Sequence, residues 1–370
     1  MKVTAPQMGT LQILLEDLFG RLGTEFIPAP ATNQEALEIG SRLGPELACL
    51  PLKIAIGNLV QGLEKGADTI VMAGGVGPCR FGYYAQIQRL ILERAGYKFK
   101  TIVVEPPGAG FREFVGAFEK LAPGVNNWQL YNIIKTSFYK TRALDFLEKK
   151  SLHLRAYETK KGSITKAKKK GIGLISKADS KREIKKAYDQ AANELENVKS
   201  DNKRDVLRVG LTGEFYLLLE PFANFDIEEY LGHRGIYIER GVYISDWISP
   251  SGKNKVFGVP KNKGAQDAAP YLDHFVGGEG QPTISHIVHF AEEEFDGAIH
   301  LFPFTCMPEI IADNILPKVL KDHDFSLLTL VLDEQSGRAG LITRLEAFID
   351  LMKSRRKQLM NKGEAECNAA

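Results

Sequence analysis

Apolar residues follow two spacings along the first hundred positions. Leucines and Phe19 recur at i, i+3, i+4 and i+7 over 11–22, which predicts an amphipathic helix. The short apolar runs at 69–72 and 101–104 predict buried strands, and the segments 51–63 and 84–94 predict further helices. Because a helical crossover returns the chain to the same edge of a sheet, this alternation predicts a parallel sheet with helices on both faces.

The strand pattern stops near residue 112 and returns near residue 206. Between them, residues 160–186 carry eleven Lys or Arg against Asp179 and Glu183, which predicts a helical, basic segment. Later strands are predicted at 206–211, 237–238, 242–244, 298–301 and 327–332. The sequence therefore predicts an α/β protein with two parallel-sheet domains, 1–111 and 206–355, an inserted helical region, 112–205, and a frayed tail, 356–370.

The composition is that of an ordinary soluble protein. The 370 residues are 44% apolar and 25% charged, with a formal net charge of +2, which indicates no particular class of partner. No apolar run approaches the roughly 18 residues of a membrane span, and Pro6 interrupts the start before a signal-peptide core. We expect a cytoplasmic protein that binds neither membrane nor nucleic acid, since no aromatic residues accompany the basic run.

Three of the four cysteines share one sequence context. Cys49, Cys79 and Cys306 each precede a predicted helix, whereas Cys367 lies in the tail, and four scattered cysteines are too few for a disulfide framework. Strand-to-helix loops gather at the carboxyl edge of a parallel sheet, so the three thiols are expected to converge. A helix N-terminus also favours a thiolate over a thiol.

Several uses of these thiols remain open at this point. A buried cysteine often acts only as a small apolar residue. A nucleophile needs a base within reach, and no histidine lies near any of the three in sequence. A closed zinc site usually carries paired C-x₂-C spacings, which are absent. Three thiolates in matching contexts suit a metal centre better, including a cubane iron–sulfur cluster with one open iron.

Other residues are candidates beside the thiols. Arg80 is a candidate for offsetting the charge of the metal centre or orienting an anionic substrate, and Glu309 for donating protons. Asp333-Glu334 follows a predicted strand, and His286 with His289 has a spacing that two metal ligands or a polar helix face would share. The glycine turn at 74–77 only partly matches a dinucleotide fingerprint, because Pro78 removes an N–H.

Long segments resemble a known family. The stretches are CLPLKIAIGNLVQGLEKGADTIVMAGGVGPCRFGYY at 49–84, HLFPFTCMPEIIADNILPKV at 300–319, and further matches at 209–232, 276–301 and 328–351. They resemble the activase-associated branch of the 2-hydroxyacyl-CoA dehydratase superfamily. The resemblance covers nearly the whole chain except the basic middle.

The resemblance implies two flavodoxin-like or Rossmann-like halves with a [4Fe–4S] cluster between them, held by Cys49, Cys79 and Cys306. It also implies an ATP-hydrolysing activator as the electron donor and an acyl-CoA as the substrate of a reductive dehydration. Alternatives are a low-potential reductase, a non-catalytic cluster carrier that docks the activator, and a closed zinc site. A second copy of the chain or a related subunit is a further expected partner. The basic segment at 160–186 is a candidate for docking an acidic partner protein.

Overall fold

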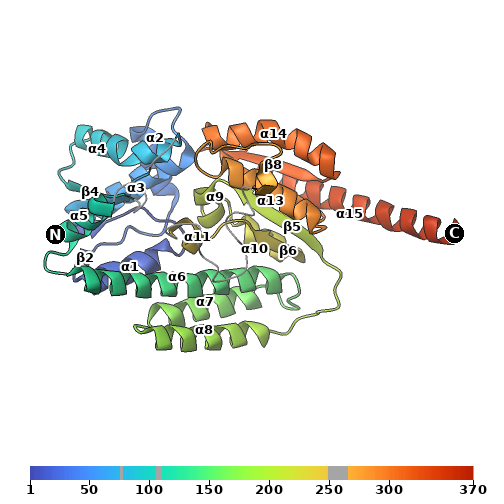
Figure 1. The fold of residues 1–370 in the computed structure, drawn as a ribbon, viewed down its shortest axis with the longest axis horizontal. Helices are drawn as coiled ribbons and strands as arrows, with labels where there is room; N and C mark the ends of the chain where they lie inside the picture. Colours follow the sequence, from blue (N-terminus) through green and yellow to red (C-terminus); the bar gives the residue numbers. More distant parts are fainter. Residues whose placement is uncertain (76–77, 106–110, 249–265, 370) are drawn as a thin grey trace.

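The computed structural model describes residues 1–75, 78–105, 111–248 and 266–369. It contains two four-stranded parallel sheets, ordered β2-β1-β3-β4 and β6-β5-β7-β8 (Figure 1). The strands of the first are β1 (Lys2–Thr4), β2 (Glu25–Phe26), β3 (Thr69–Ala73) and β4 (Lys100–Val104). Those of the second are β5 (Leu207–Gly213), β6 (Ile236–Arg240), β7 (Gly297–Pro303) and β8 (Leu327–Leu332). The prediction of two parallel-sheet domains is confirmed, and both sheets have the strand order of flavodoxin-like folds.

The helices of the first domain follow its hydrophobic pattern. They are α1 (Leu11–Leu22), α2 (Gln34–Leu43), α3 (Leu50–Glu64), α4 (Tyr84–Arg94) and α5 (Phe111–Leu121), with the short 3₁₀ turn η1 (Arg80–Tyr83) before α4. Helix α3 is buried along almost its whole length, and its polar residues Lys53, Asn58 and Gln61 are buried with it. The cap of α2 is Asn33, whose side chain accepts from the Ala36 N–H.

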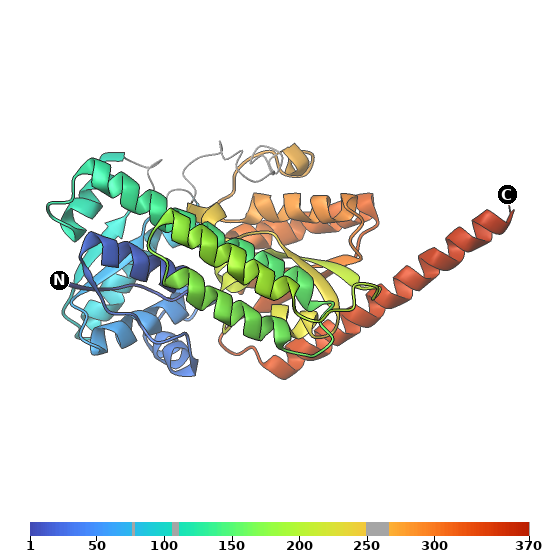
Figure 2. The same ribbon diagram turned by 90° about the horizontal axis from the view of Figure 1, so that it is seen from below.

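The inserted segment forms a layer of three helices, α6 (Asn127–Arg155), α7 (Ser163–Ser176) and α8 (Lys181–Glu196). Capping boxes begin α6 and α8, and apolar side chains of α7 and α8 pack against α6. Lysines of α7 form ion pairs within the layer, Lys168 with Glu148 and Lys170 with Glu194. The predicted helical, basic insertion is therefore confirmed, and α6 lies along both domains (Figures 1 and 2).

The second domain differs from its prediction in two places. Its helices are α9 (Phe215–Leu219), α10 (Ile227–Gly232), α11 (Ile244–Ile248), α13 (Gly280–Glu292), α14 (Met307–His323) and α15 (Arg338–Ala369). The strand predicted at 242–244 is wrong: the chain leaves the sheet after Arg240, and α11 begins at Ile244. The expected frayed tail instead continues α15, which extends away from the body (Figure 2). Among the described helices, none is long and apolar enough to cross a membrane.

The two domains share one core. Leu50 and Ile54 of α3 belong to the same cluster of buried side chains as Leu217 of α9 and Leu330 of β8. Beside that cluster, the Lys53 ammonium, only 2% exposed, donates to Glu334 Oε1 at 2.5 Å and to the Glu46 carbonyl at 3.0 Å. The position of α3 is therefore tied to the second domain by apolar packing and by a buried charge.

Helix α3 also lies unusually close to α2. A Cβ atom built on Gly57 would lie 1.8 Å from the Ala36 carbonyl oxygen, and one built on Gly40 would lie 1.7 Å from the Lys53 carbonyl oxygen. Only glycine permits this approach of the two backbones, because any side chain would push the helices apart. The closeness of the two helices fixes where α3 begins, and hence where Cys49 lies.

We expect Gly57→Ala to destabilise the protein by about 2 kcal/mol or more, because the added methyl group has no space between α2 and α3. The matched control is Gly20→Ala in α1, where the methyl group meets no atom within 4 Å. That change should be neutral or stabilising by about 0.5–1 kcal/mol, since alanine favours helix. Chemical denaturation measures both, and equal effects would contradict the close approach.

Candidate functional site

The three predicted thiols occupy the same structural position. Cys49, Cys79 and Cys306 are the N-cap residues of α3, η1 and α14. Cys79 and Cys306 follow β3 and β7, which hold equivalent places in the two sheets, beside the reversal of strand order. Cys49 differs from the expectation of a strand-to-helix loop, because it lies in the turn between α2 and α3. Cys49 is buried, and the other two are half-buried.

Contacts between loops of different domains bring these positions together. A Cβ atom built on Gly278 would lie 3.7 Å from the Cys79 sulfur and 3.3 Å from Pro308 Cγ, in the first turn after Cys306. The Phe81 ring, two residues beyond Cys79, packs edge-on against Phe215 of the second domain with centroids 5.8 Å apart. The carboxyl edges of the two sheets therefore meet at the thiols.

Arg80 joins two of the cysteine loops. Its guanidinium donates to the carbonyl oxygen of Thr305 and, at 2.9 Å, to the hydroxyl of the same residue. It also donates to the Leu47 carbonyl at 3.2 Å. The Thr305 hydroxyl itself donates to the Leu47 carbonyl at 3.1 Å. Arg80 thus holds the residue before Cys306 against the loop before Cys49. Its predicted role toward an anionic substrate stays a prediction.

The thiols differ from the expectation of thiolates at helix starts. Burial raises the pKa of Cys49, Cys79 and Cys306, and the nearby Glu214 carboxyl raises it further. The Tyr84 hydroxyl, 2.5 Å from the Cys49 sulfur, lowers the pKa of that thiol without outweighing burial. Desolvation exceeds the effect of the helix starts, so the three sulfurs are neutral unless a cation neutralises the thiolates.

Glu214 is a site residue that the sequence analysis missed. It follows β5, caps α9 and accepts from the Leu217 N–H at 3.0 Å. Burial, with smaller contributions from Glu309 and Glu279, raises its pKa from 4.5 to about 8. The pattern at 212–215 could have predicted it, because an acid between the end of a strand and an apolar helix start is typical of a helix cap at the sheet edge.

Glu309 lies behind Cys306 in a buried polar cluster. Its carboxylate accepts from the Thr283 hydroxyl at 3.0 Å and lies 2.8 Å from His300 Nε2, and both Glu309 and His300 are fully buried. Burial opposes protonation of His300, but Asp313 and Glu309 together raise its pKa. Glu309 therefore connects α14 to β7 and α13, and its predicted proton donation stays a prediction.

The remaining candidates lie elsewhere. His286 Nδ1 is 2.9 Å from the Thr212 hydroxyl, and burial lowers the pKa of His286 to about 4. Glu334 pairs with Lys53, and the glycine turn at 76–77 lies outside the described residues. In the part of the chain that the structure describes, no three His, Cys, Asp or Glu side chains are grouped so that they could hold a metal ion.

Large exposed apolar side chains stand close in sequence to the thiols or to the loop that contacts Cys79. They lie before Cys49, in η1 after Cys79, before Cys306, in the first turn of α14, and in the segment leading to Gly277: Leu47, Tyr83, Phe304, Ile310 and Phe275, which are 42–68% exposed. We call these five residues the apolar collar. Exposed apolar groups gathered at one place mark contact surfaces more often than isolated ones do.

No protein-family model and no curated protein matches the chain.

We expect Glu214→Gln to change the pH dependence of stability of the apoprotein. A carboxyl whose folded pKa is raised stabilises the fold while protonated, and this contribution is lost as pH rises from about 4.5 to 8. The glutamine side chain has no such loss, so the variant should gain stability relative to the wild type between pH 5 and 8, on the order of 3 kcal/mol. Chemical denaturation at several pH values measures this, and a difference independent of pH would contradict it.

Proposed function

We propose that this protein is an iron–sulfur protein of the 2-hydroxyacyl-CoA dehydratase type. Cys49, Cys79 and Cys306 would hold a [4Fe–4S] cluster at the junction of the two sheets. The proposal rests on one observation above all: three N-cap cysteines come from three separate loops that contact one another where the two domains meet. The resemblance at 49–84 and 300–319 supports the same assignment.

The chemistry of the three thiols supports metal ligation over nucleophilic catalysis. A nucleophilic cysteine needs a depressed pKa or an adjacent base, whereas burial raises the pKa of all three thiols. Iron held by these three cysteines would take the place of the protons on the sulfurs and would offset the cost of burying their charge. Three cysteine ligands would also leave room at the cluster for a further ligand.

The protein's own residues then have defined tasks. A bound cluster supplies one-electron, low-potential chemistry, here from an ATP-hydrolysing activator to an acyl-CoA or another acceptor. Arg80 holds two ligand loops together, and its positive charge lowers the pKa of Cys49 and Cys79. Buried packing around Cys49 limits water at the sulfur, which protects a reduced centre from solvent.

We expect anaerobic reconstitution with iron and sulfide to give about four irons per chain and the visible absorption of sulfur-to-iron charge transfer. Cys49→Ala, Cys79→Ala and Cys306→Ala should each lower the iron content sharply, because each removes one ligand. Cys367→Ala is the matched control and should keep the full content.

Iron content that is unchanged in all three ligand variants would end the proposal. Stoichiometric zinc and no colour in protein purified in air, with zinc lost in the same three variants, would instead establish the closed zinc site.

The apolar collar favours a docked protein partner, which both a catalytic component and a non-catalytic cluster carrier require. Four of its five side chains lie within four residues of Cys49, Cys79 or Cys306 in the sequence, and Phe275 lies three residues before Gly278, which approaches the Cys79 sulfur. We propose that the activator docks there, because electron transfer to a buried centre requires close approach. Assays of 2-hydroxyacyl-CoA thioesters then separate the two roles: an enzyme dehydrates one of them, whereas a carrier is reduced without turnover.

We expect Tyr83→Glu and Phe304→Glu to slow reduction by the activator and ATP at least tenfold, because a charge at the centre of an apolar contact opposes docking. Iron content should stay unchanged, since both side chains are more than half exposed. Trp128→Glu on α6 is the matched control: its ring is 75% exposed but lies outside the collar, so reduction should keep its normal rate. Equal rates in all three variants would contradict docking at the collar.

A further inference from the structure

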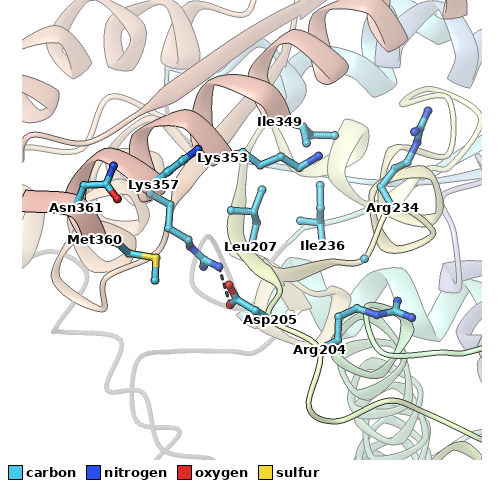
Figure 3. A pocket seen from close by; sticks show the side chains of 12 residues that line it. Arg204, Asp205, Leu207, Arg234, Ile236, Ile349, Lys353, Lys357, Met360 and Asn361 are labelled. Carbon is cyan, nitrogen blue, oxygen red and sulfur yellow. Dashed lines mark hydrogen bonds and ion pairs between the residues drawn. The ribbon is translucent and has the colours of Figure 1, made fainter. Parts of the chain in front are cut away.

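A second feature of the molecule lies away from the thiols, between α15 and the start of the second sheet. It is a cavity of about 600 Å³ bounded by the beginnings of β5 and β6, the turn at Arg234-Gly235, and the exposed part of α15 (Figure 3). Strand β5 runs from this cavity to Glu214, so the two places are about 20 Å apart at 3.3 Å per residue. The cavity is therefore separate from the thiol site.

Cationic side chains dominate the rim of the cavity. They come from three segments that are far apart in sequence: Arg204, Arg234, Lys353, Arg356 and Lys357. Among the described residues that line the cavity, the one acid is Asp205. Arg356 pairs with Asp296 and Asp205, and Arg234 pairs with Glu346. These acids neutralise part of the positive charge and hold both guanidinium groups in place.

Three of the cations remain available. Within the described residues, neither Arg204 nor Lys357 forms an ion pair with a carboxylate, and Lys353 has only Asp350 at 3.9 Å. Arg204 is nevertheless positioned, because its guanidinium donates to the Ala156 carbonyl at 3.1 Å and lies beside Gly235. Within the described residues, no carboxylate lies closer than 3.9 Å to the charged groups of these three cations, and a bound anion would neutralise them.

The floor of the cavity is apolar. Buried Leu207, Ile236 and Ile349 form it, and the exposed Met360 closes one side (Figure 3). An anion alone would leave these side chains unused, whereas a ligand with an apolar or aromatic portion would contact them. The volume lies within the range of small-molecule pockets.

We propose that this cavity binds a small organic phosphate, with its phosphate groups on Arg204, Lys353 and Lys357 and its apolar portion on the floor. Guanidinium and ammonium groups together suit phosphate oxygens, and a diphosphate matches several cations spread over a rim. This site is independent of the metal centre, so it should bind its ligand in the apoprotein as well.

Calorimetric titration with ADP, pyrophosphate and adenosine at 50 mM salt tests the proposal. We expect saturable binding of ADP below about 1 mM, loss of binding with adenosine, and weaker binding at 500 mM salt because the charges are screened. The double variant Lys353→Gln, Lys357→Gln should bind ADP at least tenfold more weakly. Both side chains are exposed, so the fold should be unaffected, and Lys318→Gln on α14 is the matched exposed control.

Met360→Ala separates the two halves of the site. It should weaken binding of ADP and leave binding of pyrophosphate unchanged, because only ADP reaches the apolar floor. Absence of saturable ADP binding, or equal binding by the double variant and the wild type, would overturn the proposal. Binding of a polyglutamate peptide without binding of ADP would also overturn it and would assign the surface to an acidic protein partner.

Discussion

Desolvation of three sulfurs where two sheets meet is the constraint around which the candidate site is built. Burial keeps Cys49, Cys79 and Cys306 protonated, and the neighbouring Glu214 adds to that effect. Helix starts alone would favour thiolates, but burial favours the protonated thiols more strongly. A bound multivalent cation would reverse this balance, because it neutralises the charge of the thiolates. Under the proposed function, iron binding and completion of the junction are one event.

The junction exists because two similar sheets present the same edge to each other. In both sheets the direction in which successive strands are added reverses between the first and the third strand of the sheet. Cys79 follows the third strand of the first sheet, and Cys306 follows the third strand of the second. Cys49 joins them through α3, whose position depends on glycine contacts with α2 and on Lys53 reaching Glu334. A frame of this kind fixes the positions of residues that come from distant parts of the chain.

Local patterns account for most of the fold and for the list of candidate ligands. Apolar periodicity predicted the strands at 69–72, 101–104 and 327–332 and the helix at 84–94, because burial on a sheet or helix face leaves its spacing in the sequence. It failed at 242–244, where the chain has left the sheet and α11 begins at Ile244. In the tail, where a frayed end was expected, α15 continues to Ala369. Periodicity records that a residue is buried, but not which element buries it.

The sequence by itself determined two parallel sheets, a helical insertion and three cysteines at helix starts, because these depend on residue spacing over short distances. Tertiary structure decided the rest. It gave Arg80 its contacts with Thr305 and Leu47, put Glu309 against His300, and raised the pKa of Glu214 to about 8. Those properties depend on which distant groups share a desolvated space, and no local pattern records that.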